Sequence, residues 1–593
     1  MKARLSRLVS SRVFVAIAVL LAVGLLLPSL RVGFMMDDYA QLFWLRGGSH
    51  AAGGPRGIWD LFRFQGPERE SFAIALDRGY WPWWTNPEMR LAFFRPLASL
   101  THAFDHALFP NSPALMRLES VLIYGAAVAI VGVLYRRLLG ATVAAGLAML
   151  MYALDDAHSV TVVWIANRNA VLAATFGFAA LLLHDRAVRG GDRRARVAGP
   201  IAFALSLLSA EAGLATVAYL VAHALWLHTD RWTRRLAAIA PYLAVAAVWM
   251  LAYKALGYGA SGADFYIDPG REPLRFLGAL ATRLPILLEG QFSFPPSDVW
   301  MLVPPEHRTK MFAVVLVLVL LGTTVLAFGV RRTRENGFFA TGMVLSLIPV
   351  CATWPGDRLL IFAGFGAFGL VGDFLTAPRE LLTHGRRVVV RAAAVFYILL
   401  HIVAAPLYYA GRATLIAEML HAPIERAAAT LPPSSELAGK TLVIVNGPDF
   451  LIPSLGLMTR FRRGEPLPDR TRQLAIAVRG RVLFRRTGER TVEMILTKGF
   501  FHDPFSLVFR KEDALMTLGE RVQVPGMTVT AKAYTEDRKS IATMEFELDR
   551  PLGDPSIVWT VWGTSGMERF PLPAIGEEVE LPAIDYQKTL EAR

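Results

Sequence analysis

The chain has 593 residues, of which 54% are hydrophobic and 19% charged. This composition excludes a large soluble protein and predicts one that crosses a membrane many times. The net charge of +13 comes mostly from short arginine-rich segments between apolar runs. It forms no single basic face, so we expect no nucleic-acid partner.

The first apolar run, residues 12–30, is long enough to span a bilayer. Lys2, Arg4 and Arg7 precede it and should hold the N-terminus in the cytoplasm. We interpret the run as a retained anchor rather than a cleaved signal sequence. It is long for a signal sequence, and no small-residue cleavage site follows it.

Two adjacent carboxylates, Asp37-Asp38, come just after this run. The orientation of the first helix places them outside, at the edge of the bilayer, where a charge is costly to keep. We therefore interpret Asp37 as a catalytic base, and Asp38 as the residue that orients it or contacts the donor. The alternative is a solvated acidic cap on a loop.

Further apolar runs recur up to residue 410, and the arginine clusters between them fall in loops that alternation assigns to the cytoplasm. The pattern predicts about eleven transmembrane helices, with the C-terminal region outside the cytoplasm. The further runs cover residues 118–135, 138–154, 168–184, 197–210, 212–228, 236–256, 311–330, 337–354, 358–375 and 391–410.

The expected organisation is a polytopic transmembrane domain, residues 1–410, and a second domain, residues 411–593. The first domain has a Trp- and Pro-rich outer loop, residues 31–117, which should lie at headgroup level, and a later outer loop, residues 258–310. Short β-prone runs separated by polar turns predict a mostly β extracytoplasmic C-terminal domain. Its role is either that of a scaffold or lid, or the binding of carbohydrate.

Unusual polar residues gather at the predicted outer ends of the helices, where charges usually pair or line a cavity. Each has an ordinary alternative: Arg95 could snorkel, Arg168 could pair with Asp155, and Glu211 could bridge a helix end. Together they indicate one polar cavity. Its candidates are Arg95, Asp155, Asp156, His158, Arg168, Glu211 and Arg358.

The chemistry available to such a cavity follows from its residue types. A carboxylate can take a proton from a hydroxyl, and arginines can hold a phosphate as it leaves. The arginine candidates are Arg95, Arg168 and Arg358. A general base together with arginines that bind phosphate, at a membrane surface, would be suited to transfer a group from a lipid phosphate to an alcohol.

An acidic pair just after the first transmembrane helix of a polytopic chain resembles the C-type (GT-C) glycosyltransferases. These include the protein O-mannosyltransferases and the lipid A aminoarabinose transferases. The resemblance implies a GT-C-like helical fold and a hexosyl- or pentosyltransferase. Its donor would be a polyprenyl-phosphate sugar, its acceptor an extracytoplasmic protein, lipid or glycan, and its base the acid in the first loop.

Residues 10–375 are most similar to the O-mannosyltransferases that carry tetratricopeptide repeats. The similar stretches are Phe94-Arg95-Pro96-Leu97, His158 followed by Val162-Val163-Trp164-Ile165-Ala166-Asn167-Arg168, and Leu208-Ser209-Ala210-Glu211.

The chain also departs from that pattern. Ala210 replaces a lysine, Asp155-Asp156 replaces a His-Pro, and a β domain takes the place of the repeats. A divalent metal ion at Asp155-Asp156 is left open, because two adjacent acids are not by themselves a metal motif.

We expect an integral membrane protein of a bacterial inner (plasma) membrane, with its C-terminal domain in the periplasm. Two other functions compete with the transferase. A transporter or flippase for a lipid-linked glycan would need polar residues at mid-membrane and on both sides. A catalytically inactive membrane scaffold would not need its charged residues.

Overall fold

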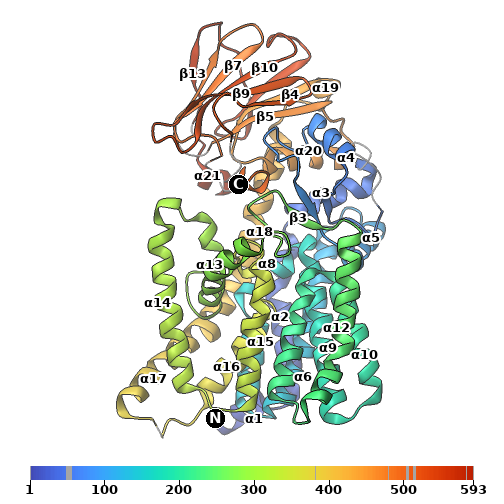
Figure 1. Ribbon diagram of the computed structural model, residues 1–593, viewed down its shortest axis with the longest axis vertical. Coiled ribbons are helices and arrows are strands. Elements are labelled where there is room, and N and C mark those ends of the chain that lie inside the picture. Colours follow the sequence, from blue (N-terminus) through green and yellow to red (C-terminus); the bar gives the residue numbers. More distant parts are fainter. Residues whose placement is uncertain are drawn as a thin grey trace. The chain divides into compact units, whose positions relative to one another are not determined.

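A computed structural model describes residues 2–48, 57–380, 382–477, 480–501, 506–511, 516–582 and 584–591 (Figure 1). The chain forms two compact units. Unit 1 consists of Met1–Gly33, Phe93–Leu256 and Asp268–Ala417. Unit 2 consists of Phe34–Ala92, Gly257–Ile267 and Glu418–Arg593.

Unit 1 is helical. Its elements are α1 (Lys2–Val9), α2 (Val13–Leu26), η1 (Leu27–Arg31), α5 (Pro96–Leu108), α6 (Pro113–Leu139), α7 (Val143–Ala153), α8 (Asp156–Val163), η3 (Ile165–Asn167), α9 (Arg168–Gly190), α10 (Arg193–Ser209), η4 (Glu211–Leu214), α11 (Ala215–Trp226), α12 (Trp232–Ala255), α13 (Pro273–Phe292), η5 (Ser297–Leu302), α14 (Pro305–Gly329), α15 (Arg334–Val350), η6 (Asp357–Leu359), α16 (Ala363–Thr376), α17 (His384–Ile398), η7 (Leu399–Ala404) and α18 (Ala405–Thr430), within which the chain passes to unit 2.

Local sequence fixes where these helices begin. Ser112 caps α6, with its Oγ accepting a hydrogen bond from the Leu115 amide at 3.3 Å and Pro113 in the first turn. Asp155 caps α8 in the same way, its Oδ1 accepting from the Ala157 amide at 3.4 Å. The second cap places an acid from the predicted cavity at a helix start.

Membrane-spanning helices dominate unit 1. Within the described residues, six helices are long and apolar enough to cross a membrane. In Glu306–Gly329, only 11% of the most apolar stretch is buried inside the protein, so most of that surface needs lipid rather than water around it. The chain is an integral membrane protein. The six are Val13–Arg31, Pro113–Leu139, Ile165–Gly190, Trp232–Ala255, Glu306–Gly329 and His384–Thr430.

The other predicted spans are also helical, but they are shorter or less apolar. Val143–Ala153 and Ala363–Thr376 are apolar helices below the length of a full span. The total of about eleven spans therefore stays a prediction. The predicted outer loop 258–310 contains a helix of its own, α13, which the proline-rich sequence did not indicate.

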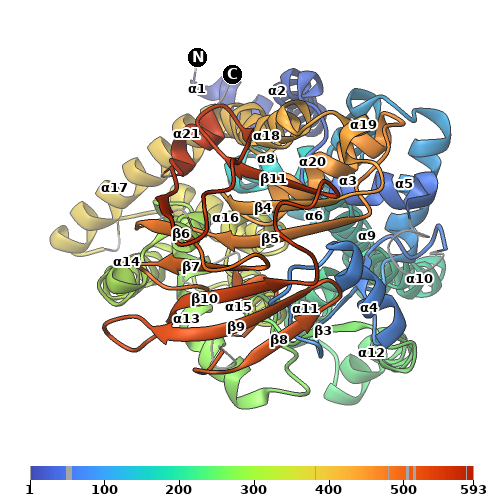
Figure 2. The ribbon, with the colours of Figure 1, turned by 90° about the horizontal axis from the view of Figure 1, so that it is seen from above.

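Unit 2 is mostly β, as the sequence predicts, and Figure 2 shows its strands from above. One sheet is antiparallel with the order β13-β6-β7-β10-β9-β8. A second has the order β12-β11-β4-β5, in which β4 is parallel to both β5 and β11. A small sheet, β1-β2-β3, is built from segments that precede the C-terminal region in the chain.

The parallel pair β4 and β5 is joined by α20, a β-α-β crossover that the β-prone runs alone did not predict. The elements of unit 2 are α3 (Asp37–Phe43), η2 (Trp44–Gly48), β1 (Arg63–Gln65), α4 (Arg69–Arg78), β2 (Arg90–Ala92), β3 (Gly259–Ser261), α19 (Ser434–Leu437), β4 (Thr441–Gly447), α20 (Leu451–Arg462), β5 (Arg470–Ile476), β6 (Val482–Arg486), β7 (Thr491–Leu496), η8 (Ser506–Val508), β8 (Arg521–Val524), β9 (Met527–Tyr534), β10 (Ile541–Leu548), β11 (Ile557–Trp562), β12 (Met567–Arg569), β13 (Glu578–Glu580) and α21 (Tyr586–Glu591).

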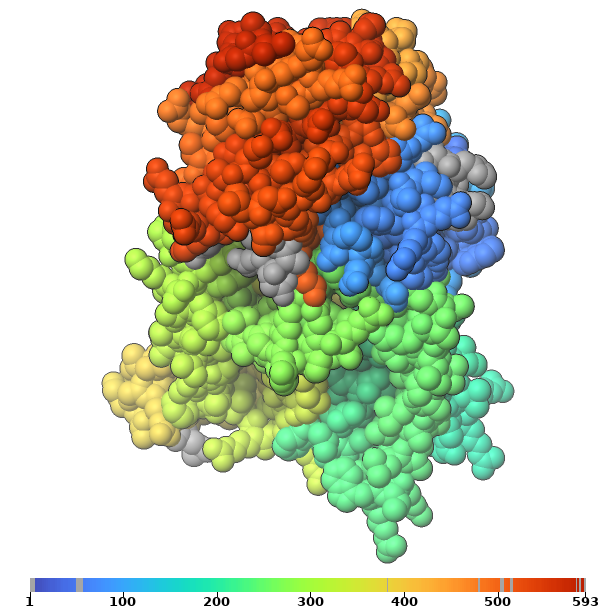
Figure 3. Space-filling view, turned by 45° about the horizontal axis from the view of Figure 1, so that its top comes forward, coloured from blue at the N-terminus to red at the C-terminus, as the bar shows by residue number. Residues whose placement is uncertain are grey.

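The tryptophans of the first outer segment belong to the core of unit 2. Trp83 is 3% exposed and Trp84 1%, and the Trp83 ring meets Phe546 of β10 at 5.6 Å between centroids. Their predicted place at headgroup level is therefore wrong, because the strands of the C-terminal region bury them. Figure 3 shows this blue segment packed against the orange and red strands.

Helix α4 is fixed to β5 by a close backbone contact. Gly79 ends the helix with φ of +81°, and a Cβ there would lie 2.0 Å from the Thr471 carbonyl oxygen. Only glycine fits both the positive φ and this approach. The contact ties a segment from the first hundred residues to the C-terminal strands.

Candidate active site

The acidic pair stands at the start of α3 in unit 2. Asp37 is the first residue of the helix, and Met36 before it has φ 42° and ψ −118°, a conformation that is rare for a residue with a side chain. Asp38 is 3% exposed, and its Oδ2 accepts a hydrogen bond from the Met35 amide at 2.9 Å. Backbone strain of this kind is often kept at functional sites.

Asp38 therefore holds the turn, while Asp37 is half-buried in the first turn of α3. A carboxylate at that position is stabilised by the amide groups of the helix start. The geometry agrees with different tasks for the two acids, but it does not test the predicted role of Asp37 as a base.

Tyr39, on the same helix, anchors a polar group of unit 2. Its hydroxyl donates to Glu425 Oε1 at 3.1 Å and lies 2.9 Å from His421 Nδ1. Burial and then the Glu425 carboxylate raise the pKa of Tyr39, so the hydroxyl stays a donor at neutral pH. Glu425 also pairs with Arg463, and with Arg462 at 3.9 Å.

Three arginines lie around this helix. Arg46 Nη1 donates to the Arg462 carbonyl oxygen at 2.6 Å, at the C-terminal end of α20. Burial lowers the pKa of Arg46, and the nearby Arg462 guanidinium lowers it further, which is the effect of a like charge. A bound anion would relieve this repulsion. We call Arg46, Arg462 and Arg463 the arginine group.

Unit 1 has a second charged assembly, centred on Arg412 of α18. Arg412 Nη1 lies 2.8 Å from Asp156 Oδ2 and 2.6 Å from Asp357 Oδ2, and its Nη2 lies 2.6 Å from Asp298 Oδ2. The three acids come from α8, η5 and η6. Asp357 is 3% exposed, and its Oδ1 also accepts from the Ser297 amide and hydroxyl at 2.8 and 2.6 Å.

Asp155 and His158 lie beside this Arg412 cluster. Gln291 Nε2 donates to Asp155 Oδ2 at 3.2 Å, and His158 Nε2 is 3.7 Å from the same oxygen. Burial raises the pKa of Asp155 to about 7, and burial together with Asp155 raises that of Asp156 to about 6. Burial lowers the pKa of His158 to about 4.

Three buried polar atoms near the Arg412 cluster lack hydrogen-bond partners among the described residues. They are His158 Nε2, Gln291 Oε1 and Glu289 Oε1. Burial and then Asp357 raise the pKa of Glu289 to about 7. Unpaired buried polar atoms are uncommon, and here they sit among acids with raised pKa values, which is typical of a binding or catalytic site.

Asp155, Asp156 and His158, which are neighbours at the start of α8, thus lie in or beside the Arg412 cluster. Sequence reasoning missed Arg412 and Asp298, the residues that complete the cluster. Asp298 lies in the short helix η5, two residues after the pair Pro295-Pro296, in a segment whose sequence shows no periodicity. Arg412 comes two residues after the last predicted apolar run, where a flanking cation is ordinary.

The remaining candidates have internal partners. Arg168 is fully buried, and its Nε donates to Ser120 Oγ at 2.8 Å while its Nη2 meets Asp105 Oδ2 and the Met116 carbonyl at 2.5 Å. These bonds favour a role in holding α5, α6 and α9 together over the predicted role in binding phosphate.

Two further candidates also pair with each other. Arg95 Nε lies 2.7 Å from Glu211 Oε2, and the Arg95 guanidinium covers the Phe93 ring at 4.4 Å. Glu211 thus bridges the start of α5 and the turn before α11. Arg358 is half-buried in η6, next to Asp357.

No metal centre is evident in the part of the chain that the structure describes, where no group of three or more His, Cys, Asp or Glu is arranged to hold an ion. In the Arg412 cluster, the guanidinium is the cation that the three carboxylates share. The metal left open at Asp155-Asp156 therefore has no assigned ligand set.

No protein-family model and no curated protein matches the sequence. Solved structures similar to the chain include the Archaeoglobus fulgidus oligosaccharyltransferase in the apo form, with 13% identity and a TM-score of 0.39 over 77% of this chain and 64% of that one. They also include ArnT from Cupriavidus metallidurans bound to undecaprenyl phosphate, with 13% identity and a TM-score of 0.38 over 77% of this chain and 88% of that one.

Both similar structures are GT-C glycosyltransferases, the class that the sequence resemblance indicates. At TM-scores below 0.5, the similarity assigns neither an activity nor a substrate to this chain. The likeness to O-mannosyltransferases with tetratricopeptide repeats stays a prediction.

Proposed function

We propose that the chain is an integral membrane glycosyltransferase of the GT-C type, which moves a sugar from a polyprenyl-phosphate donor to a hydroxyl of an extracytoplasmic protein, lipid or glycan. The observation that carries this proposal is the strained turn at Met36, with Asp37 at the helix start and Asp38 fixed by the Met35 amide. It occurs on a chain whose long apolar helices give it access to lipid donors.

In the proposed reaction, Asp37 takes the proton of the acceptor hydroxyl while that oxygen bonds to the anomeric carbon. The bond from this carbon to the donor phosphate breaks, and polyprenyl phosphate leaves with the electron pair. The sugar is transferred with inversion. Asp38 keeps Asp37 in place through the turn that it holds.

Phosphate binding has one candidate in each unit. Arg358 of η6 keeps its predicted role in unit 1. In unit 2, the arginine group offers Arg46 and Arg462, whose mutual repulsion an anion would relieve. Planar guanidinium groups suit phosphate because each can donate two parallel hydrogen bonds.

Replacement by lysine tests each candidate separately, because lysine keeps the positive charge but cannot donate two parallel hydrogen bonds to one phosphate. We expect Arg358→Lys or Arg462→Lys to weaken binding of a polyprenyl-phosphate sugar by about 1–3 kcal/mol, the range for a hydrogen bond to a charged group. The measurement is titration of the purified protein in nanodiscs with a fluorescent donor. The matched control is Arg332→Lys, an exposed arginine between α14 and α15. Unchanged affinity in both variants excludes both sites.

The Arg412 cluster suits the hydroxyl groups of a sugar or an acceptor. Its carboxylates can accept hydrogen bonds from hydroxyls, and the unpaired Gln291 Oε1 and Glu289 Oε1 can do the same. Its acids outnumber its arginine, so it is less suited to a phosphate than the arginine group.

We further propose that the N-terminus is cytoplasmic and that unit 2 is periplasmic, in a bacterial inner membrane. The arginine-rich loops at alternate helix ends support this orientation. A reporter that is active only in the periplasm, fused after Arg593, should be active. A fusion after Arg332, in a predicted cytoplasmic loop, is the control and should be inactive. The opposite pattern contradicts the orientation.

A further inference from the structure

The strained turn before Asp37 also has contacts with other parts of unit 2. Met36 has φ of 42°, and a residue with a side chain keeps such a conformation where its surroundings enforce it. Asp38 supplies one contact from within the turn, through the Met35 amide. A turn closed by its own residues can still move as a whole, so its place depends on the elements around it.

One ring nitrogen of His421, on α18, contacts both flanks of this turn. His421 Nδ1 lies 2.9 Å from the carbonyl oxygen of Phe34 and 2.9 Å from the hydroxyl oxygen of Tyr39. Phe34 comes three residues before Asp37, and Tyr39 comes two residues after it. All of these residues belong to unit 2. A single imidazole therefore bridges the two sides of the segment that carries the proposed base.

The neighbours of Nδ1 define the tautomer of His421. A carbonyl oxygen can only accept a hydrogen bond, so the contact with Phe34 requires a hydrogen on Nδ1. The Tyr39 hydroxyl donates its own hydrogen to Glu425 Oε1 at 3.1 Å, so toward Nδ1 its oxygen is an acceptor as well. His421 thus shares one N–H between two oxygens, a role that involves no proton transfer.

Two ring contacts fix the Phe34 side chain. Phe34 is 3% exposed, and its ring meets that of Tyr39 edge-on at 6.0 Å between centroids. The Arg462 guanidinium, from the C-terminal end of α20, lies over the Phe34 ring at 5.4 Å. These contacts place the side chain, whereas the hydrogen bond from His421 orients the Phe34 carbonyl group and with it the peptide bond to Met35.

The place of this turn matters for a base. A general base must lie within hydrogen-bond reach of the proton that it takes, and a displacement of about 1 Å can cost about 10²-fold in rate. We propose that His421 is a positioning residue for Asp37, which holds the strained turn through its Nδ1–H. The inference rests on the proposed function, because it takes Asp37 as the base, but its first test needs no sugar transfer.

Hydrogen exchange in the full chain in nanodiscs tests the hold on the turn without any donor. The amides of Asp38 and Tyr39 are hydrogen-bonded within the turn at 2.9 and 3.1 Å, so their exchange reports its opening. His421→Leu keeps a side chain of similar size and removes the donor. We expect exchange in residues 34–39 to become at least about fivefold faster, the scale of one hydrogen bond.

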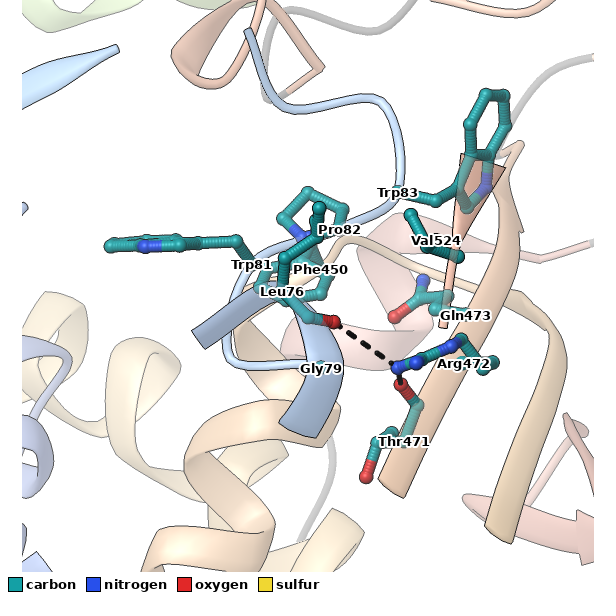
Figure 4. A pocket seen from close by; sticks show the side chains of 10 residues that line it. All are labelled: Leu76, Gly79, Trp81, Pro82, Trp83, Phe450, Thr471, Arg472, Gln473 and Val524. Carbon is teal, nitrogen blue, oxygen red and sulfur yellow. Dashed lines mark hydrogen bonds between the residues drawn. The ribbon is translucent and has the colours of Figure 1, made fainter. Parts of the chain in front are cut away.

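Helix α4 is the internal control, because it belongs to the same outer segment but is attached elsewhere. Arg472 of β5 donates to the Leu76 carbonyl oxygen at 3.3 Å, at the end of α4, as Figure 4 shows. It also donates to the Asp77 carbonyl oxygen at 2.9 Å. Exchange in α4 should be the same in wild type and His421→Leu. Faster exchange in both segments would show general unfolding of unit 2 and contradict a local hold on the turn.

His421→Asn separates the hydrogen bond from proton transfer. The Asn side chain has its amide nitrogen as many bonds from Cβ as Nδ1 of histidine, so it can donate to the Phe34 carbonyl but cannot act as an acid or base. Exchange in residues 34–39 should return to the wild-type rate. In the transfer assay, kcat should fall about tenfold in His421→Leu and recover in His421→Asn, with KM for the donor unchanged in both.

Thr430→Val is the matched control on α18. Thr430 Oγ1 accepts from the Met567 amide at 2.8 Å, so this change removes a bond between α18 and β12 and leaves the turn intact. Exchange in residues 34–39 and sugar transfer should both stay at wild-type values. If His421→Leu does not fold, Tyr39→Phe carries the test, because loss of the hydroxyl frees the other flank of the turn from Glu425 and should speed exchange there.

Four results overturn the proposal. If residues 34–39 exchange alike in wild type and His421→Leu, His421 does not hold the turn. If His421→Asn exchanges as fast as His421→Leu, the hydrogen bond is not what holds it. If His421→Asn restores slow exchange but not transfer, His421 is an acid or base rather than a positioning residue. If the exchange results hold but the wild-type protein transfers no sugar, the proposed function fails, and His421 stabilises the turn without serving a base.

Discussion

Asp37→Asn should lower sugar transfer by about 10²-fold or more, the usual scale for removing a general base. Asparagine keeps the size and polarity of the side chain at the start of α3 but cannot take the acceptor proton. The measurement is transfer from a labelled lipid donor in proteoliposomes, at matched protein levels and with donor affinity measured in parallel. Donor affinity should stay close to that of the wild type.

Asp38→Asn is the matched control for this change. Its amide oxygen can still accept the hydrogen bond from the Met35 amide that holds the turn, so transfer should fall much less than in Asp37→Asn. If Asp37→Asn transfers sugar at nearly the wild-type rate, Asp37 is a solvated cap and not the base.

Arg412→Met should destabilise unit 1 by about 3–5 kcal/mol, the range for breaking a buried ion pair from one side. The change leaves Asp156, Asp298 and Asp357 without their shared cation. Leaving the Asp357 carboxylate without a cation should cost the most of the three, because Asp357 is only 3% exposed. The measurement is the free energy of unfolding of the purified protein in mild detergent, which is obtained from a denaturant titration.

Two variants show whether the loss comes from uncompensated charge. Arg412→Met combined with Asp357→Asn should recover part of the stability, because one buried charge disappears with its partner. Asp298→Asn alone should cost only about 0–1 kcal/mol, since the Asp298 side chain is 49% exposed. Equal stability of wild type and Arg412→Met would show that the cluster does not hold α8, η5, η6 and α18 together.

The sequence predicted the helical elements well because hydropathy acts locally. Each predicted apolar run forms helix, and the alternating burial of β7, where Val492, Met494 and Leu496 are buried, is the pattern expected of a strand with one face in the core. The β-α-β crossover through α20 was not predicted, since a helix of only 12 residues between two buried strands gives a weak local signal.

Residues whose partners are distant in sequence were predicted least well. The bonds of Arg412 to Asp156, Asp298 and Asp357 span 256, 114 and 55 residues, and no local pattern reports such distances. Trp83 and Trp84 suit a membrane interface by composition, yet strands from the far end of the chain bury them. The sequence gives the chemical type of a side chain, but which residues surround it depends on the fold.

Arg168 shows the same limit for a candidate site residue. At the predicted outer end of a span, it is indistinguishable in sequence from a phosphate ligand such as Arg358. In the structure, Arg168 is fully buried with Asp105 and Ser120, while Arg358 is half-buried. The two arginines differ in solvent exposure, which cannot be read from the sequence.

Sugar transfer by the purified wild-type protein tests the proposed function most directly. The protein is reconstituted in liposomes with polyprenyl-phosphate sugars labelled in the sugar, together with cell-envelope extract as a source of acceptor. The proposal predicts that label passes from lipid to acceptor and that free polyprenyl phosphate appears in equal amount, in wild type but not in Asp37→Asn. Movement of intact labelled lipid across the bilayer, with no release of polyprenyl phosphate, would contradict a transferase and indicate a flippase.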